Sequence, residues 1–102
     1  MQTCIACGMP LNDPAEIGGE LEEGSVCMHC ATADGKVKSC TEVFEGGVQF
    51  FLGALTEANR DLAERLTRKN MNRLPYWQKH PDVCLDGPEA SEQEFADALA
   101  QL

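Results

Sequence analysis

Two Cys-x-x-Cys pairs constrain the fold of this chain more than any other feature. Cys4 and Cys7 form the first pair, and Cys27 and Cys30 form the second after a gap of 19 residues. Two such pairs separated by roughly 15 to 20 residues are typical of a site in which four thiolates bind one tetrahedral zinc ion. The sequence therefore predicts a metal site formed by Cys4, Cys7, Cys27 and Cys30, with one zinc ion per chain.

A single Cys-x-x-Cys can instead be a redox-active pair. That interpretation expects one pair before a helix in a βαβ unit, and neither pair here has that context. Iron in a rubredoxin-like site is a further alternative, because cysteine spacing does not separate zinc from iron. Zinc is favoured because it is the commoner occupant of structural four-cysteine sites.

The 102 residues suffice for one small domain with a modest core. Residues 1–40 hold five of the six cysteines, four of them in the two pairs, and only scattered apolar residues, so this segment needs a bound metal to hold its fold. We expect a small α+β protein: a zinc ribbon of short strands over residues 1–40, and a helical segment over residues 41–102. The helical segment should pack on the ribbon to form one compact unit.

The helical segment is predicted to hold one long and one short helix. Ser39 and Glu42 fit a capping box at the start of the long helix, and Pro75 should end that helix near residues 70–73. The pair Gly46-Gly47 is costly inside a helix and could separate its first turns. The apolar stripe of the long helix comprises Val48, Phe51, Leu52, Leu55, Leu62 and Leu66. A second capping box at Ser91 to Glu94 starts a short C-terminal helix with apolar residues Phe95, Leu99 and Leu102, which should fold back on the long one.

The long helix also suggests a way to bind a partner. Part of its apolar stripe follows heptad spacing with Asn59 at one seam position, and a buried asparagine can fix the register of a coiled coil. A protein partner or self-association through this helix is one interpretation. The alternative is an intramolecular contact with the C-terminal helix through Phe95 and Leu99.

Charge is unevenly distributed along the chain. The net charge of −9 disfavours nucleic-acid binding, but residues 60–79 carry six basic side chains beside Tyr76 and Trp77. This segment is either a solvated helix face paired with nearby acidic residues or a surface that stacks on a nucleic-acid strand. Tyr76 and Trp77 can equally close the core between the two helices.

Four further residues have metal-binding or redox chemistry. Cys40 and Cys84 are either half-buried thiols or a pair, and with His29 and His80 they could form a second metal site. No spacing rule supports that second site. No apolar run is long enough to span a membrane and the start of the chain lacks the features of a secretory signal, so we expect a cytoplasmic protein without membrane contact.

The stretches "CIACGMPL" and "CMHCATADGKVKSCTE" resemble a family of small prokaryotic proteins called "putative zinc ribbon". The resemblance covers about residues 3–45 and extends more loosely to "NMNRLPYW". It implies zinc on Cys4, Cys7, Cys27 and Cys30.

Three classes of function follow. The favoured one is a zinc-binding interaction or regulatory module, and the alternative is a nucleic-acid-binding ribbon that uses residues 60–79. An enzyme is not expected, because the chain has no phosphate-binding loop, nucleophile elbow or deaminase signature. Four cysteines also close the open position that a catalytic zinc needs.

Overall fold

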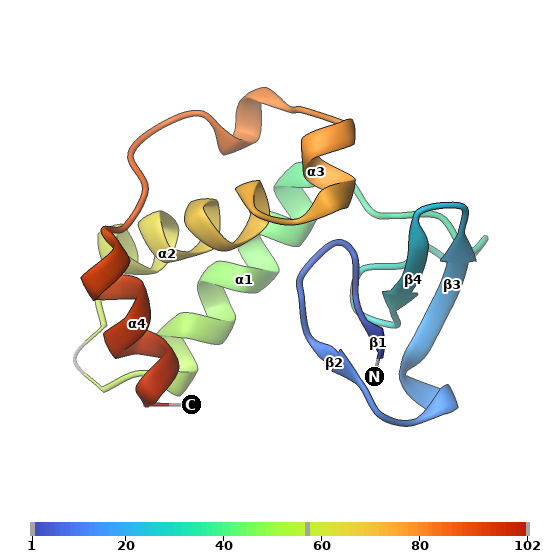
Figure 1. Ribbon diagram of the computed structural model, residues 1–102, viewed down its shortest axis with the longest axis horizontal. Helices are drawn as coiled ribbons and strands as arrows, with labels where there is room; N and C mark the ends of the chain where they lie inside the picture. Colours follow the sequence, from blue (N-terminus) through green and yellow to red (C-terminus); the bar gives the residue numbers. More distant parts are fainter. Residues whose placement is uncertain (1, 57, 102) are drawn as a thin grey trace.

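The chain places short strands beside a group of helices, as Figure 1 shows. The computed structural model describes residues 2–56 and 58–101. Its strands are β1 (Gln2–Thr3), β2 (Pro10–Leu11), β3 (Ile17–Leu21) and β4 (Gly24–Cys27). Its helices are α1 (Cys40–Ala54), α2 (Arg60–Asn72), α3 (Pro75–Lys79) and α4 (Glu92–Ala100), with 3-10 turns η1 (Pro14–Glu16) and η2 (Val83–Leu85). The predicted small α+β fold, with short strands followed by helices, is confirmed.

The strands form two antiparallel hairpins. In the first, Thr3 of β1 pairs with Pro10 of β2, and in the second, Leu21 of β3 pairs with Gly24 of β4. A two-stranded sheet is marginal on its own, because it has too little surface to bury a core. The hairpins therefore depend on what packs against them.

The predicted single long helix is wrong in detail, because the chain breaks into α1 and α2. Leu55 ends α1 in an extended conformation, and Asn59 caps α2 by accepting a 2.8 Å hydrogen bond from the backbone N–H of Leu62. Asparagine is a favoured N-cap because its side chain satisfies one of the free amides of the first turn. Asn59 is thus a cap and not the polar position of a heptad seam. Helix α2 ends at Asn72, within the range of residues 70–73 predicted for the end of the long helix.

The expected break at Gly46-Gly47 does not occur, and α1 runs through both glycines. Gly47 lies where α1 contacts α2. A Cβ at this position would lie 2.7 Å from Cγ2 of Thr67, closer than real carbon contacts allow. Gly47 therefore lets the two helices approach, which compensates for its low helix propensity.

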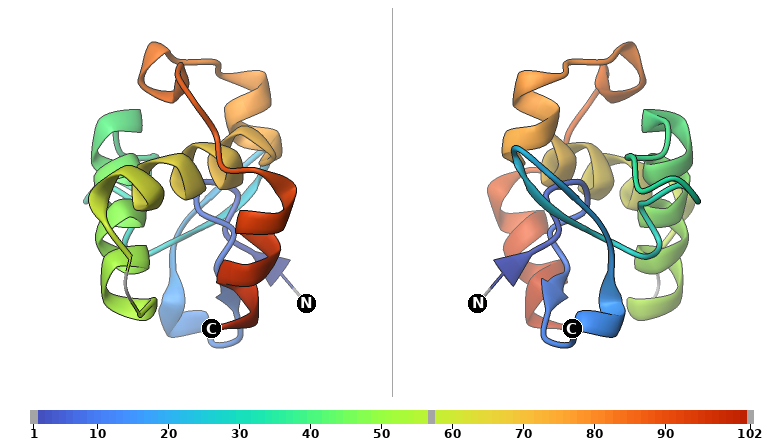
Figure 2. Two further views of the ribbon diagram at one scale, coloured as in Figure 1. Left: turned by 90° about the vertical axis from the view of Figure 1, so that its left-hand side faces the viewer. Right: turned by 90° about the vertical axis from the view of Figure 1, so that its right-hand side faces the viewer.

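The predicted C-terminal helix is confirmed as α4. Ser91 and Glu94 form the full capping box, whereas at α1 the Glu42 carboxylate accepts from the Ser39 hydroxyl instead of the cap amide. Phe95 is buried, but Leu99 is 48% exposed, and Leu102 lies outside the described residues. Figure 2 shows α2 crossing α1 and α4.

Buried residues divide into two cores. One lies among the helices and comprises Val48, Phe51, Leu55, Ala63, Leu66, Ala90, Phe95 and Ala98. The other joins the strands to the helices and includes Ile5, Leu11, Val26, Val43, Met71, Trp77 and Leu85 together with four cysteines, Cys4, Cys27, Cys30 and Cys40. Among the described residues, no helix has the length and apolar character needed to cross a membrane.

Candidate metal centre

The two Cys-x-x-Cys pairs lie in two turns that face each other. Cys4 follows β1 and Cys7 precedes Gly8, while Cys27 is the last residue of β4 and Cys30 lies in the following turn. Gly8 has a φ of +80°, a conformation that side chains other than glycine rarely adopt. This glycine lets the first turn close, with its N–H donating a 2.8 Å hydrogen bond to the carbonyl of Cys4.

The structure brings the four predicted ligands together. Their sulfur atoms all lie within 4.8 Å of one another, and the sulfurs of Cys7 and Cys27 are 3.7 Å apart. A tetrahedral zinc ion with Zn–S bonds of about 2.3 Å requires S···S distances of about 3.8 Å. The four sulfurs therefore form a metal-binding site whose donor set and spacing fit zinc.

Backbone amides support negative charge at this site. The N–H groups of Ala6 and Cys27 donate hydrogen bonds to the Cys4 sulfur at 3.4 and 3.3 Å. Cys4 and Cys27 are fully buried, and Cys30 is 4% exposed. Such hydrogen bonds favour the thiolate form of Cys4 and orient its sulfur. Hydrogen bonds to metal ligands from surrounding groups commonly have this effect.

Burial and the close packing of the sulfurs shift the pKa values of Cys4, Cys7 and Cys30 in different directions. Hydrogen bonds from Cys30 and Cys7, and then from backbone amides, lower the pKa of Cys4 against the effect of burial. For Cys7, a hydrogen bond with Cys30 lowers the pKa, but hydrogen bonding with Cys4, burial and the Cys4 charge together raise it to about 12. Hydrogen bonds with Cys4 and Cys7, together with burial, raise the pKa of Cys30. A divalent cation would allow all four to become thiolates.

Two side chains from the helices hold the first turn in place. Asn70 of α2 donates a 3.0 Å hydrogen bond to the carbonyl of Cys7, and Trp77 of α3 donates one of 2.7 Å to the carbonyl of Ala6. Neither role was predicted from the sequence, although Asn70 and Trp77 are the first and last residues of the "NMNRLPYW" stretch of the family resemblance. Trp77 packs against the metal turn and not between the two predicted helices.

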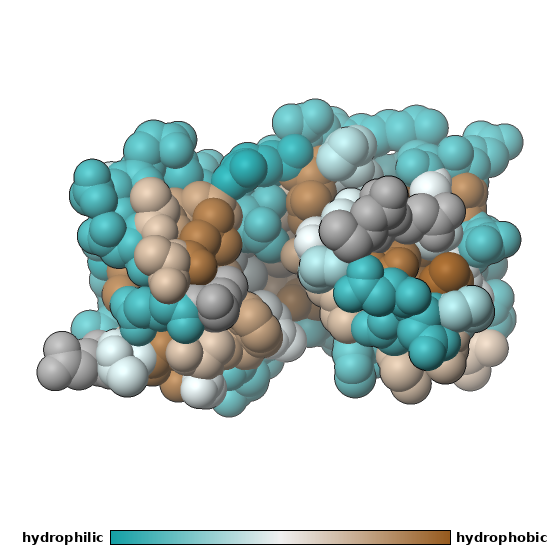
Figure 3. Space-filling model, turned by 60° about the horizontal axis from the view of Figure 1, so that its bottom comes forward, coloured by the Kyte–Doolittle hydropathy of each residue, from teal (hydrophilic) through white to brown (hydrophobic). Residues whose placement is uncertain are grey.

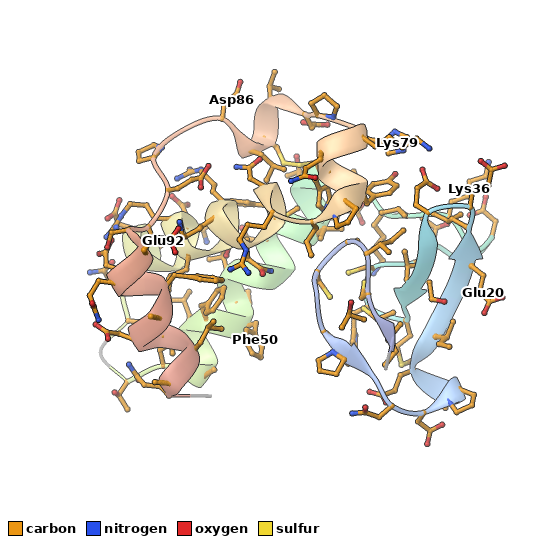
Figure 4. All side chains as sticks on the ribbon, viewed as in Figure 1. Glu20, Lys36, Phe50, Lys79, Asp86 and Glu92 are labelled. Atoms are coloured by element: carbon orange, nitrogen blue, oxygen red, sulfur yellow. A yellow bond between two sulfur atoms is a disulfide. The ribbon has the colours of Figure 1, made fainter. Side chains whose placement is uncertain are left out.

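The remaining metal-ligand candidates do not form the second site that included both histidines. His29 is exposed, and Nε2 of His80 lies 2.8 Å from the Glu23 carboxylate. Cys40 and Cys84 are joined by a disulfide, drawn as a yellow bond in Figure 4, so the interpretation of two separate thiols is wrong. A carboxylate oxygen of Asp82 lies within 4.8 Å of both of these sulfurs.

The basic segment 60–79 is engaged within the protein. Its ion pairs are Arg60 with Glu45 and Glu64, Arg65 with Asp61 and Glu94, Arg68 with Glu64, Lys69 with Glu92, and Lys79 with Glu23. Arg73 lies over the ring of Phe95, with its guanidinium carbon 4.9 Å from the ring centre. The Arg68 and Lys69 side chains are only 17% and 12% exposed, so they present little charge to an outside ligand.

Two short hairpins, one with two cysteines in its turn and the other with two cysteines at and after its last strand, bring four cysteines together at one point. This arrangement defines the zinc-ribbon class of protein. Comparison with protein families gives the same result, because residues 3–78 match the family described as "Putative zinc ribbon domain". The chain belongs to this family, and the match extends beyond the cysteines through α1, α2 and most of α3.

Two other comparisons gave no relatives. No curated protein and no solved structure matches this chain.

Proposed function

We propose that this protein is a zinc-stabilised interaction module: one structural Zn²⁺ on Cys4, Cys7, Cys27 and Cys30 holds the fold, and the surface binds a protein partner. The observation that carries this proposal is the donor set. Catalytic zinc sites keep one position open for water or substrate, whereas four cysteines fill a tetrahedral zinc. The ion would therefore act on structure and not on a substrate, and we propose no enzymatic activity.

The surface offers an anchor for a protein partner. Phe50 on α1 is 54% exposed, although the adjacent Phe51 is 5% exposed and lies in the helical core. Figure 4 shows Phe50 on the side of α1 that faces the strands. Figure 3 shows a hollow between the helices and the strands, with hydrophobic residues on both sides. Exposed aromatic side chains next to apolar surface are common anchors of protein interfaces.

The ion pairs of segment 60–79 favour a protein partner over a nucleic acid. Nucleic-acid binding requires basic side chains that can release counterions from phosphates. Here acidic side chains of α1, α2, α4 and the second hairpin already neutralise most of those groups. We therefore propose that these residues serve the fold.

Affinity capture with the zinc-loaded protein tests the proposal. We expect an identified protein partner whose binding is lost in Phe50→Asp and kept in Val83→Asp, because Val83 is equally apolar and 81% exposed but lies on η2. Direct binding of purified components should follow the same pattern. Salt-dependent binding of single-stranded RNA or DNA that is weakened by Arg73→Glu and unaffected by Phe50→Asp would overturn the proposal in favour of the nucleic-acid function.

A further inference from the structure

We propose that Cys40 and Cys84 form a reversible thiol–disulfide pair that exchanges with low-molecular-weight thiols and disulfides, with Cys84 as the exchanging sulfur. The other four cysteines are free and must be thiolates to hold a metal. The structure therefore holds four free thiols and one disulfide in the same chain. The two kinds of cysteine site have separate chemistry within one chain.

The geometry lets the bond form and open locally. The Cα atoms of Cys40 and Cys84 are 6.3 Å apart, within the usual range of disulfides of about 4.4 to 6.8 Å. Cys40 begins α1, which is packed in both cores, whereas Cys84 lies in the three-residue turn η2. Opening therefore requires movement of the segment around η2 and not of α1.

Burial decides which sulfur a reagent reaches. Cys40 is 5% exposed, while Cys84 is half-buried and its neighbours Asp82 and Val83 are exposed. A surface hollow is lined by residues on either side of Cys84 in the chain, Pro81, Asp82, Val83 and Asp86, although Cys84 itself does not line it. Thiol–disulfide exchange requires approach to one sulfur along the line of the bond, so attack should occur at Cys84.

The leaving sulfur is also well placed. Cys40 is the first residue of the 15-residue helix α1, after the N-cap Ser39. The positive end of a helix dipole favours a thiolate at this position. Attack on Cys84 releases Cys40 as a thiolate at this end of α1.

The exchange is balanced in both directions. In opening, the thiolate of reduced glutathione attacks Sγ of Cys84, the Sγ–Sγ bond breaks, and Cys40 leaves as a thiolate. A second glutathione thiolate attacks the mixed disulfide, giving oxidised glutathione and the Cys84 thiolate, and both protein thiolates take up protons as required. In closing, the Cys84 thiolate attacks oxidised glutathione, and Cys40 then displaces glutathione from Cys84.

Opening should loosen the segment 82–89 alone. Besides the disulfide, this segment is held by the buried Leu85, by a 3.3 Å hydrogen bond from Asn72 to the carbonyl of Leu85, and by one of 3.1 Å from Arg68 to the carbonyl of Pro88. The helical core lies outside it. A regional rise in hydrogen exchange over residues 82–89 is therefore the structural signature that we expect.

The test uses the full, zinc-loaded chain in glutathione buffers, with alkylation of free thiols and peptide mass mapping. Free thiols are alkylated in denaturant after the exchange is stopped with acid, so that burial does not limit the label. We expect no label on Cys40 or Cys84 after oxidised glutathione, both labelled after excess reduced glutathione that leaves the protein folded, and loss of both labels after return to oxidised glutathione. In Cys40→Ser, Cys84 should take one glutathione. In Cys84→Ser, the buried Cys40 should take none.

Three results would overturn the inference. The pair could stay closed in excess reduced glutathione while the protein remains folded, which would make it a permanent structural bond. The adduct could form on Cys40 and not on Cys84. The reduced pair could fail to reoxidise and instead bind a second zinc ion with Asp82, measured as a second metal equivalent lost in Cys84→Ser. Because labels are mapped to Cys40 and Cys84, the outcome is independent of whether the ribbon holds zinc.

Discussion

The indole Nε1 of Trp77 donates a 2.7 Å hydrogen bond to the carbonyl of Ala6, a residue 71 positions away that lies between two metal ligands. Trp77 is 5% exposed and packs in the core shared by strands and helices. The position of α3 is thereby coupled to the turn that carries Cys4 and Cys7. Loss of the metal should therefore change the environment of Trp77 as well as that of the sulfurs.

The protein should contain one zinc ion per chain after purification without added metal. Coordination by four thiolates should stabilise the folded strand region on the order of 10 kcal/mol. Elemental analysis should give one equivalent for the wild type and much less for Cys27→Ser. Cys84→Ser is the matched control and should keep its zinc. A metal-free protein that stays folded over residues 3–38 would contradict this prediction.

Chelation should shift the tryptophan fluorescence. The chain has one tryptophan, so the signal comes from Trp77 alone. When the turn around Ala6 loses its metal, the indole loses its acceptor and gains contact with water, which moves emission to longer wavelength. Trp77→Phe should lower the free energy of unfolding by about 1 to 3 kcal/mol, because it removes ring volume and leaves a buried carbonyl without its donor. Tyr76→Phe keeps this bond and serves as the control, and an emission spectrum unchanged by chelation would contradict the coupling.

The helical core should survive metal removal. Its members, among them Val48, Leu66 and Phe95, all come from the helical part of the chain. Chelated protein should keep most of its helical circular dichroism and its amide protection in α1 and α2, and lose protection in the hairpins. Complete loss of helix on chelation would show that the two cores fold only together.

The sequence predicts those features of the fold and the site that depend on residues close together in the chain. The cysteine spacing and the Ser91 capping box are local, and both predict what the structure shows. The break between α1 and α2 was missed because apolar residues continue in helical spacing across it, although Asn59 followed by Asp61 is a start signal for α2. The contacts of Asn70, Trp77 and Cys84 join residues far apart in the chain, and no local pattern reveals them.

Removal of the α2 cap should weaken the protein measurably. Asn59→Ala leaves the N–H of Leu62 without its side-chain acceptor and should lower the free energy of unfolding by about 1 kcal/mol. Asn59→Ser retains a capping oxygen and should stay close to the wild type. Denaturant unfolding of the zinc-loaded proteins measures both. If Asn59 instead held a register between chains, Asn59→Leu would change the sedimentation coefficient, which we do not expect from a cap.

Gly47→Ala and Gly46→Ala should have opposite effects on stability. A Cβ at Gly46 meets no atom within 4 Å, so alanine there should raise the free energy of unfolding by about 0.5 to 1 kcal/mol. A Cβ at Gly47 would lie 2.7 Å from Cγ2 of Thr67. Thr67 is 2% exposed and its hydroxyl donates a 2.7 Å hydrogen bond to the carbonyl of Ala63, so it has little freedom to move.

The cost of this overlap should exceed the gain in helix propensity, since inserting a methyl group into a packed interface costs about 1 to 3 kcal/mol. Thr67→Ser removes Cγ2 and keeps the hydroxyl, so it should recover most of the loss when combined with Gly47→Ala. A double-mutant cycle from denaturant unfolding measures this coupling. Equal stabilisation by Gly47→Ala and Gly46→Ala would contradict the inference that α1 and α2 pack too closely at Gly47 to admit a Cβ.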